Sequence, residues 1–258
     1  GTVTTTLEVL VSAEDDAEVR QVSVFNAGGE TLDIDITSCA ELALLAQNAD
    51  LAHPAFTKLF VQTEYIPQSR ALVATRRRRT GDEPEIWVAH LALCDSPIEV
   101  ETDRARFIGR RRDARHPAAM ATHAPLSGTT GTVLDALLAI RARVSVRPGA
   151  MARVTYWTMV APTRAALLDL IDTHQDQAAF ERARTLAWTQ AQVQLRHLDV
   201  SPSMADLFQR LAGHILFATP SLRAPSAQIA RGAGAQPLLW EQGISGDLPI
   251  VVLRVREN

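Results

Sequence analysis

Apolar and polar residues alternate with a period of two through much of the first 160 residues. The clearest alternating runs are Thr6–Val11, Glu18–Val24 and Thr31–Thr37, and the Asn26–Glu30 segment before the third run supplies turn-forming residues. β-Branched residues with one polar side, separated by Asn/Gly turns, are typical of antiparallel strands with one solvated face. Further strands are predicted over residues 58–63, 71–75, 86–93, 98–101, 139–146 and 152–160.

The predicted strands follow one another without helices between them. The last two are joined by a tight turn at Arg147-Pro148-Gly149, whose residue types favour turns. Strands in direct succession favour a β-sandwich over a doubly wound parallel sheet, in which helices alternate with strands.

The pattern changes to a helical period at Ala161. Pro162 suits the first turn of a helix, and Ser201-Pro202 opens another helix that Thr219-Pro220 ends. Between them, an apolar stripe predicts a helix of about 20 residues from Asp176 to Leu198. The apolar faces of the three helices carry Leu167, Leu168, Leu170 and Ile171, then Phe180, Ala183, Ala187, Ala191, Leu195 and Leu198, then Met204, Leu207, Phe208, Leu211, Ile215 and Leu216.

These patterns divide the chain into three regions. An antiparallel β-sandwich is predicted over residues 1–160 and an α-helical linker over residues 161–220. Residues 221–236 are rich in Gly, Ala, Pro and Ser and are predicted to form a loop, which leads into an apolar tail within the third region, 221–258.

The composition is that of a folded protein without a strong electrostatic preference. The 258 residues are 47% hydrophobic and 21% charged, and 26 basic against 29 acidic residues give a net charge of −3 and a pI of about 6.2. This balance argues against a disordered chain, and against nucleic acid or an anionic membrane as the partner. No apolar run approaches the roughly 18 residues of a membrane helix, so no membrane contact by this segment is expected.

Cys39 and Cys94 belong to no CxxC or Cys/His cluster. Two reduced, buried cysteines are favoured over a disulfide bridge, and a structural zinc site is not predicted. The chain has no signal peptide, begins at Gly1 and carries the apolar run Pro249–Val255 near its end, which needs a partner to cover it. We therefore expect a piece of a longer, cytoplasmic protein.

Two clusters of arginines invite a functional interpretation. Arg76–Arg79 is followed at once by acidic residues and lacks interleaved aromatic residues, so a solvated hairpin tip with local charge pairing is favoured over nucleic-acid binding. The second cluster is Glu101–Arg112. Here we favour ion pairs between arginines and carboxylates that fix a loop over contacts with sugar hydroxyls or phosphate.

Motifs for metal binding or nucleophilic catalysis are lacking. The seven histidines form no HxH, HxxxH or HExxH group. The Gly/Thr-rich segment Leu126–Thr132 lacks the lysine of a phosphate-binding loop, and Ser127 lacks the preceding glycine of a nucleophile elbow.

The segment Trp240–Pro249 is the strongest candidate for ligand binding. Trp240 offers a flat face, Asp247 offers a bidentate acceptor, and glycines on either side of Ser245 allow close approach of the backbone. Sugar rings need flat faces for their C–H groups and forked hydrogen bonds for their hydroxyls. A tight structural turn under a neighbouring domain explains the same residues equally well.

Six blocks of the sequence occur in an order that spans nearly the whole chain, from about Thr4 to Arg256. They are Thr37–Glu41, His53–Glu64, Glu101–Arg110, Pro125–Gly128, Leu186–Val193 and Gly243–Val251. Together they closely resemble bacterial cyclic β-1,2-glucan synthases. The chain departs from that pattern at Cys39, where tyrosine is common, and at Arg111-Arg112, where a second glycine is frequent.

The resemblance implies the phosphorylase-like region of such a synthase, related to glycoside hydrolase family 94 and the cellobiose phosphorylase group. The implied fold class is mainly β: a partial galactose-mutarotase-like β-supersandwich, then a helical linker, then the start of an (α/α)₆ barrel within residues 221–258. Early strands of the sandwich are expected to be missing, which would leave an exposed sheet edge.

In the family, a carboxylic acid protonates the leaving oxygen of a β-1,2-glucosyl bond while inorganic phosphate, the co-substrate, attacks from the opposite side. The resemblance places that acid in the barrel, so no catalytic residue is assigned to this segment, which is expected to be inactive alone. No cofactor and no metal are expected. The assigned substrate contacts are Trp240, Ser245 and Asp247.

The expected partners are a β-1,2-glucan or another glucose oligosaccharide and the downstream (α/α)₆ domain of the parent chain, and a homodimer is left open. Other segments of the parent are expected to anchor it in the bacterial inner membrane. Two functions remain open: a scaffold that completes part of a carbohydrate site in glucan synthesis and chain-length control, and a stand-alone carbohydrate-binding module for β-glucans.

Overall fold

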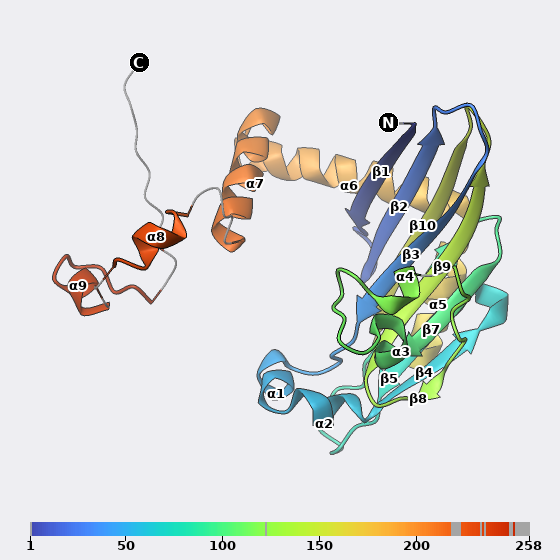
Figure 1. The fold of residues 1–258 in the computed structure, drawn as a ribbon, viewed down its shortest axis with the longest axis horizontal. Helices are drawn as coiled ribbons and strands as arrows, with labels where there is room; N and C mark the ends of the chain where they lie inside the picture. Colours follow the sequence, from blue (N-terminus) through green and yellow to red (C-terminus); the bar gives the residue numbers. More distant parts are fainter. Residues whose placement is uncertain are drawn as a thin grey trace. The chain divides into compact units, whose positions relative to one another are not determined.

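A computed structural model describes residues 2–121, 123–217, 223–232, 234, 236–247 and 250. Strands dominate up to residue 161 and helices follow, as the sequence pattern predicts (Figure 1). The strands are β1 (Val3–Val11), β2 (Ala17–Asn26), β3 (Leu32–Glu41), β4 (Val61–Ile66), β5 (Ala71–Arg76), β6 (Trp87–Leu93), β7 (Ile98–Asp103), β8 (Gly131–Thr132), β9 (Ala136–Val146) and β10 (Met151–Ala161). The helices are α1 (Gln47–Ala52), α2 (Pro54–Lys58), the 3₁₀ turn η1 (Pro67–Ser69), α3 (Arg104–Ile108), α4 (Ala118–Ala121), α5 (Arg164–His174), α6 (Gln177–His197), α7 (Pro202–Leu216), α8 (Ser226–Ile229) and α9 (Gln236–Trp240).

The strands form two antiparallel sheets, so the predicted mainly β sandwich is confirmed. The large sheet has the order β1-β2-β10-β6-β5-β4-β8 and the small sheet the order β3-β9-β7. Their facing sides enclose a core to which the small sheet contributes Leu138 and Ile140, and the large sheet Val154 and Tyr156. The Tyr156 hydroxyl donates a 2.8 Å hydrogen bond to the Ile36 carbonyl, which ties the two sheets together.

A second core lies on the opposite face of the large sheet. Leu167 and Ile171 of α5 and Phe180 of α6 pack against Trp157 and its neighbours in the sheet. The apolar spacing of these helices predicts this packing, because residues three and four apart lie on one side of a helix. The helices therefore cover only the part of the sheet face that is itself apolar.

The start of α7 follows the predicted capping chemistry, but Pro162, predicted in the first turn of a helix, lies outside α5, which begins at Arg164 after the capping residue Thr163. The Thr163 hydroxyl accepts a hydrogen bond from the Ala166 amide, and the Ser201 hydroxyl accepts one from the Met204 amide. Pro202 occupies the first helical position of α7. Such caps satisfy backbone donors that have no partner inside the helix.

Two predictions of local structure are wrong in part. Residues 58–63 were predicted as one strand, but the helix α2 (Pro54–Lys58) includes the first of them, and β4 begins at Val61. Pro54 favours a helical first turn, and Lys58 forms an ion pair with Asp135 at 3.1 Å, so this segment is fixed by a distant residue. Within the predicted loop, Ser226–Ile229 forms one helical turn.

Strand β1 forms an edge of the large sheet. That earlier strands of the sandwich are missing stays a prediction. Its side chains Leu7 and Val11 are 58% and 66% exposed. The apolar side chains of α7 are also exposed, Leu207 and Phe208 among them.

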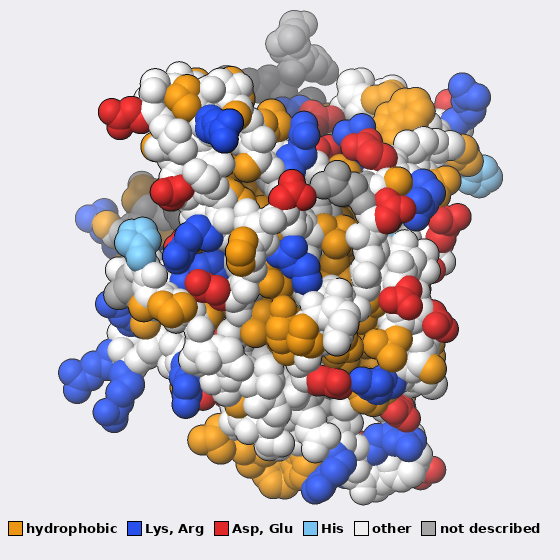
Figure 2. All heavy atoms as spheres, turned by 90° about the vertical axis from the view of Figure 1, so that its right-hand side faces the viewer, with side chains coloured by type: hydrophobic (Ala, Val, Ile, Leu, Met, Phe, Trp, Pro, Cys, Tyr) orange, Lys and Arg blue, Asp and Glu red, His pale blue; other side chains and the backbone are white. Residues whose placement is uncertain are grey.

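Acidic and basic side chains are interspersed over the face of the sandwich in Figure 2. The chain forms two compact units, residues 1–190 and 191–258. The predicted region boundaries at residues 160 and 220, and the start of a helical barrel after residue 220, stay predictions. Among the described residues, no helix is long and apolar enough to cross a membrane.

Candidate functional site

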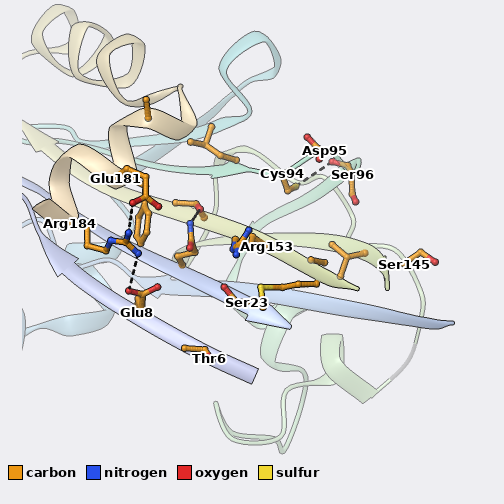
Figure 3. Close-up of a pocket in the computed structure, with 18 residues that line it drawn as sticks. Thr6, Glu8, Ser23, Cys94, Asp95, Ser96, Ser145, Arg153, Glu181 and Arg184 are labelled. Atoms are coloured by element: carbon orange, nitrogen blue, oxygen red, sulfur yellow. Dashed lines mark hydrogen bonds and ion pairs between the residues drawn. The ribbon is translucent and has the colours of Figure 1, made fainter. Parts of the chain in front are cut away.

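A polar cleft of about 850 Å³ lies on the face of the large sheet that α5 and α6 cover in part (Figure 3). Strands β1, β2 and β10 form most of its floor, while the start of α6 and the loop Cys94–Ser96 border it. The volume is within the range of small-ligand sites. All its lining residues belong to the unit of residues 1–190.

The strand register explains why this part of the sheet face stays open. Leu10, Val19 and Trp157 form one row across β1, β2 and β10, and this apolar row is covered by the helices. Alternate residues of a strand point to the same face. The next two rows along the strands therefore face the same way as this covered row.

Those next two rows carry polar side chains. They are Glu8, Gln21 and Thr155, followed by Thr6, Ser23 and Arg153. The Gln21 Nε2 donates a 3.0 Å hydrogen bond to the Thr155 hydroxyl, which links β2 and β10 across the floor. The sheet face thus changes from apolar to hydroxyl, amide and charged groups where the helices end.

An ion-pair cluster closes one side of the cleft. The Arg184 guanidinium lies 2.5 Å from the Glu181 carboxylate and 4.0 Å from the Glu8 carboxylate. This contact joins the first part of α6 to β1 (Figure 3). The arginine is thereby engaged with both acidic groups of this wall.

The opposite side of the cleft is the loop Cys94–Ser96, which Arg70 holds in place. Arg70 has a left-handed backbone conformation with φ of 51°. Its guanidinium donates to the carbonyl oxygens of Cys94, at 2.5 Å, and of Ser96. Because the loop is fixed through its backbone, the Asp95 side chain remains exposed beside the cleft.

Arg153 lies between these two walls (Figure 3). Its side chain is exposed and has no hydrogen-bond or ion-pair partner within the described part of the chain. It is directly opposite Ser23 in the strand register. The cleft therefore presents an unoccupied guanidinium fork next to hydroxyl groups.

The arrangement is suited to binding a neutral polyhydroxyl compound. Glu8, Asp95 and Glu181 outnumber Arg153 and Arg184, so the cleft offers both acceptors and donors without an excess of positive charge.

The predicted contacts Trp240, Ser245 and Asp247 lie in the second unit, where one turn after α9 brings them together. The Trp240 Nε1 donates a 3.0 Å hydrogen bond to the Ser245 carbonyl. Gln236 Nε2 donates to the same carbonyl at 2.9 Å and to the Asp247 carboxylate at 3.0 Å. Gly246 adopts a φ of 72°, which favours glycine. Trp240 stays 59% exposed, so its use as a sugar platform stays a prediction.

The first arginine cluster shows the favoured local charge pairing. Arg76 lies 2.9 Å from the Glu83 carboxylate, and Arg78 lies 3.9 Å from Glu85. The backbone amide of Arg79 also donates to Glu83. This hydrogen bond, together with Arg76, holds the pKa of Glu83 below its usual value.

The second cluster fixes a loop, as its favoured interpretation predicts. Arg104 forms a 2.6 Å ion pair with Glu41. The Glu101 carboxylate, which is buried, accepts hydrogen bonds from the amides of Thr102 and Asp103 at 2.9 Å. Asp103 in turn caps α3 by accepting hydrogen bonds from two backbone amides.

Both cysteines are free, which confirms the prediction of reduced thiols. The prediction that both are buried is wrong, since Cys39 is exposed and Cys94 is partly buried. Cys39 lies on the edge strand β3, where the sheet has no neighbour on one side. Within the described ranges, no group of three or more His, Cys, Asp or Glu side chains is placed to hold a metal ion.

The sequence pattern alone does not identify the residues of the cleft. Four of these residues lie in alternating runs that predict only strands with one solvent-exposed face: Thr6, Gln21, Ser23 and Arg153. The available signal was the change from apolar to polar residues at alternate positions of β2, from Val19 to Gln21 and Ser23. That signal identifies a site only when the register of three strands is known.

Comparison with known proteins gives two matches. Residues 1–177 match the family model described as glycosyl hydrolase 94, supersandwich domain. The chain is also 36% identical over 262 residues to the cyclic beta-(1,2)-glucan synthase NdvB of Rhizobium meliloti (strain 1021). This alignment covers 100% of the chain but 9% of that protein, so the chain spans about a tenth of the length of this relative.

Proposed function

Because this chain belongs to the family of glycosyl hydrolase 94 supersandwich domains, we propose that it is the sandwich and linker segment of a larger enzyme of β-1,2-glucan synthesis. The observation that carries the proposal is the 36% identity that runs through the whole chain, the helices after residue 177 included.

In this proposal the segment acts as a scaffold and supplies part of the carbohydrate site. The two apolar cores give the large sheet a rigid cover on each face. The open remainder of the helix-covered face is polar, and its hydroxyl and amide groups can bind the hydroxyl groups of a glucan. The segment thereby contributes to glucan synthesis and chain-length control.

The chemical step belongs to another part of the parent protein. There, a carboxylic acid protonates the glycosidic oxygen of a β-1,2-glucosyl bond while inorganic phosphate attacks the anomeric carbon from the opposite side. The (α/α)₆ domain and the anchoring of the parent in the inner membrane are parts of the same proposal.

A stand-alone carbohydrate-binding module is not favoured. The identity to the synthase continues from the sandwich into α5, α6 and the region after them. The apolar side chains of α7 are also exposed in the described part of the chain, which is expensive for an independent domain.

The test is a segment exchange in the full-length parent protein. Replacing residues 1–258 with the aligned segment of the Rhizobium meliloti synthase should preserve glucan formation and the distribution of glucan lengths. Replacing them with an unrelated β-sandwich of similar size should abolish one or both. Unchanged products with the unrelated sandwich, in a protein shown to be folded, would refute the proposal.

The tail needs a separate test in the same parent protein. If Asp247 contacts glucan, Asp247→Ala should weaken glucan affinity about tenfold, because a charge-assisted hydrogen bond is lost. Gln236→Ala removes the internal partner of Asp247 and serves as the matched control. Unchanged phosphorolysis and unchanged glucan affinity in Asp247→Ala would make the turn purely structural.

A further inference from the structure

The cleft on the large sheet has features that specify its ligand more closely than the family does. Its floor combines four neutral polar groups, from Thr6, Gln21, Ser23 and Thr155, with the guanidinium of Arg153. Gln21 and Thr155 already share a hydrogen bond, so their remaining donors and acceptors are fixed in direction. A floor of this kind is preorganised to bind several hydroxyl groups at once.

Arg153 is the arginine of the cleft whose guanidinium has no hydrogen-bond or ion-pair partner among the described residues. The other arginine of the cleft, Arg184, is engaged by Glu8 and Glu181. Arg153 itself is exposed and forms no ion pair with Asp95 in the described part of the chain. A guanidinium group donates two parallel hydrogen bonds from a rigid planar fork. The natural partner of such a fork is a pair of oxygen atoms held side by side.

The charges around Arg153 argue against a phosphate or carboxylate ligand. The cleft is lined by three acidic side chains, Glu8, Asp95 and Glu181, against two arginines, so its charge balance does not favour an anion. The aromatic side chain that lines the cleft, Phe180, is buried among the core residues and offers no exposed face for stacking. The ligand is therefore held by its hydroxyl groups, and Arg153 recognises two neighbouring hydroxyls.

We propose that the cleft binds internal glucose units of a β-1,2-glucan, with the Arg153 fork donating to the 3- and 4-hydroxyl groups of one unit. The inference rests on the proposed function and adds a site and a source of linkage specificity. In a 1,2-linked chain every internal unit keeps hydroxyls 3 and 4 free and adjacent. In a 1,3-linked chain oxygen 3 is part of the linkage, so no internal unit has a free adjacent pair.

The experiment is calorimetric titration of this chain with linear β-1,2-gluco-oligosaccharides, with β-1,3-gluco-oligosaccharides of the same length for comparison. Because cyclic glucans have no terminal units, a cyclic β-1,2-glucan is titrated as well. We expect binding of both β-1,2 forms and at least tenfold weaker binding of the β-1,3 form. Such a ratio corresponds to about 1.4 kcal/mol, the scale of one hydrogen bond.

Variants of Arg153 test the role of the fork. Arg153→Ala should weaken β-1,2-glucan binding at least tenfold, and Arg153→Lys should not restore it, because an ammonium group lacks the planar pair of donors. The matched control is Arg20→Ala, which removes an exposed arginine of the neighbouring strand β2 on the opposite face of the same sheet. Arg20→Ala should bind like the unmodified chain.

The outcomes separate this inference from the function proposed above. Failure of the chain to bind any β-1,2-glucan, equal affinity for the 1,2 and 1,3 linkages, or unchanged binding in folded Arg153→Ala would each overturn the inference. None of these results affects the segment exchange in the parent protein, which tests the proposed function by its products. Loss of binding in Arg20→Ala would place the glucan on the other face and would also overturn the inference.

Discussion

His90 gives the most direct test of the packing between the two sheets. Its side chain is 2% exposed and stacks on the Tyr156 ring with 5.9 Å between ring centres. Nδ1 shares a 3.0 Å hydrogen bond with the Thr158 hydroxyl, while the buried Nε2 has no partner among the described residues. Burial disfavours the imidazolium ion and lowers the pKa of His90 from 6.5 to about 4.

The lowered pKa makes the stability of the fold depend on pH. Between pH 6.5 and pH 4 the unfolded chain binds a proton at His90 that the folded chain does not, so acid favours unfolding. Stability is highest above pH 6.5 and falls as the pH drops toward 4. One pKa unit corresponds to about 1.4 kcal/mol, so the expected loss is about 3 kcal/mol.

The assay is urea unfolding of the chain and of His90→Gln at a series of pH values from 8 to 4. Glutamine keeps a hydrogen-bonding group near Thr158 and does not titrate. The difference in unfolding free energy between the two proteins cancels the contributions of the carboxylates and the other histidines. That difference should change by about 3 kcal/mol in favour of His90→Gln between pH 8 and pH 4.

Replacement of the exposed His197 by glutamine is the control, and it should leave the pH dependence of the unmodified chain in place. A pH-independent difference between the chain and His90→Gln would show that His90 is protonated as easily in the folded state as in the unfolded state. The described burial of its ring between the sheets would then be incorrect.

Three further predictions concern other buried or partly buried groups. Although Cys39 is an exposed residue, burial around its sulfur atom raises the pKa of the thiol to about 11, so its alkylation at pH 8 should be about 100-fold slower than that of an unperturbed thiol. Mass spectrometry of the alkylated peptide measures this rate, and a rate equal to that of free cysteine contradicts the prediction. Arg141→Met should lower the free energy of unfolding by about 3 kcal/mol, because the buried guanidinium donates hydrogen bonds to the carbonyls of Ala119 and Ala124. A decrease in this free energy of less than about 0.5 kcal/mol, measured by urea unfolding, would argue against these hydrogen bonds. Asn26→Ala should lower the melting temperature through a loss of about 2 to 3 kcal/mol, since its buried side chain makes three hydrogen bonds to backbone groups; an unchanged melting temperature would count against this role.

The type of most elements could be predicted from the sequence because the signals are local. The alternation in Glu18–Val24 identifies β2, and the turn residues Arg147-Pro148-Gly149 identify the end of β9 and the start of β10, although these two strands belong to different sheets. Ser201-Pro202 identifies the start of α7 because the cap and the fixed φ of proline act within one helical turn. The same locality explains the prediction of charge pairing around Arg76.

The assignment of strands to sheets could not be predicted in this way. β3 follows β2 in the chain but leaves its sheet and pairs with β9, while β2 pairs with β10. An alternating pattern indicates that one side of a strand is buried. It does not specify the neighbouring strand, because any strand with a matching pattern can pair with it. Short segments are also held by distant contacts, since Lys58 at the end of α2 forms an ion pair with Asp135.

The family and the mainly β fold follow from the sequence by itself, through residue patterns that act within a strand, a turn or a helix. The cleft follows only from the tertiary structure. Register places Thr6, Ser23 and Arg153 in one row, and the extent of α5 and α6 decides that this row stays uncovered while the row of Trp157 is buried. Both conditions depend on residues far apart in the chain, because pairing and coverage are properties of the assembled sheet and not of any one strand.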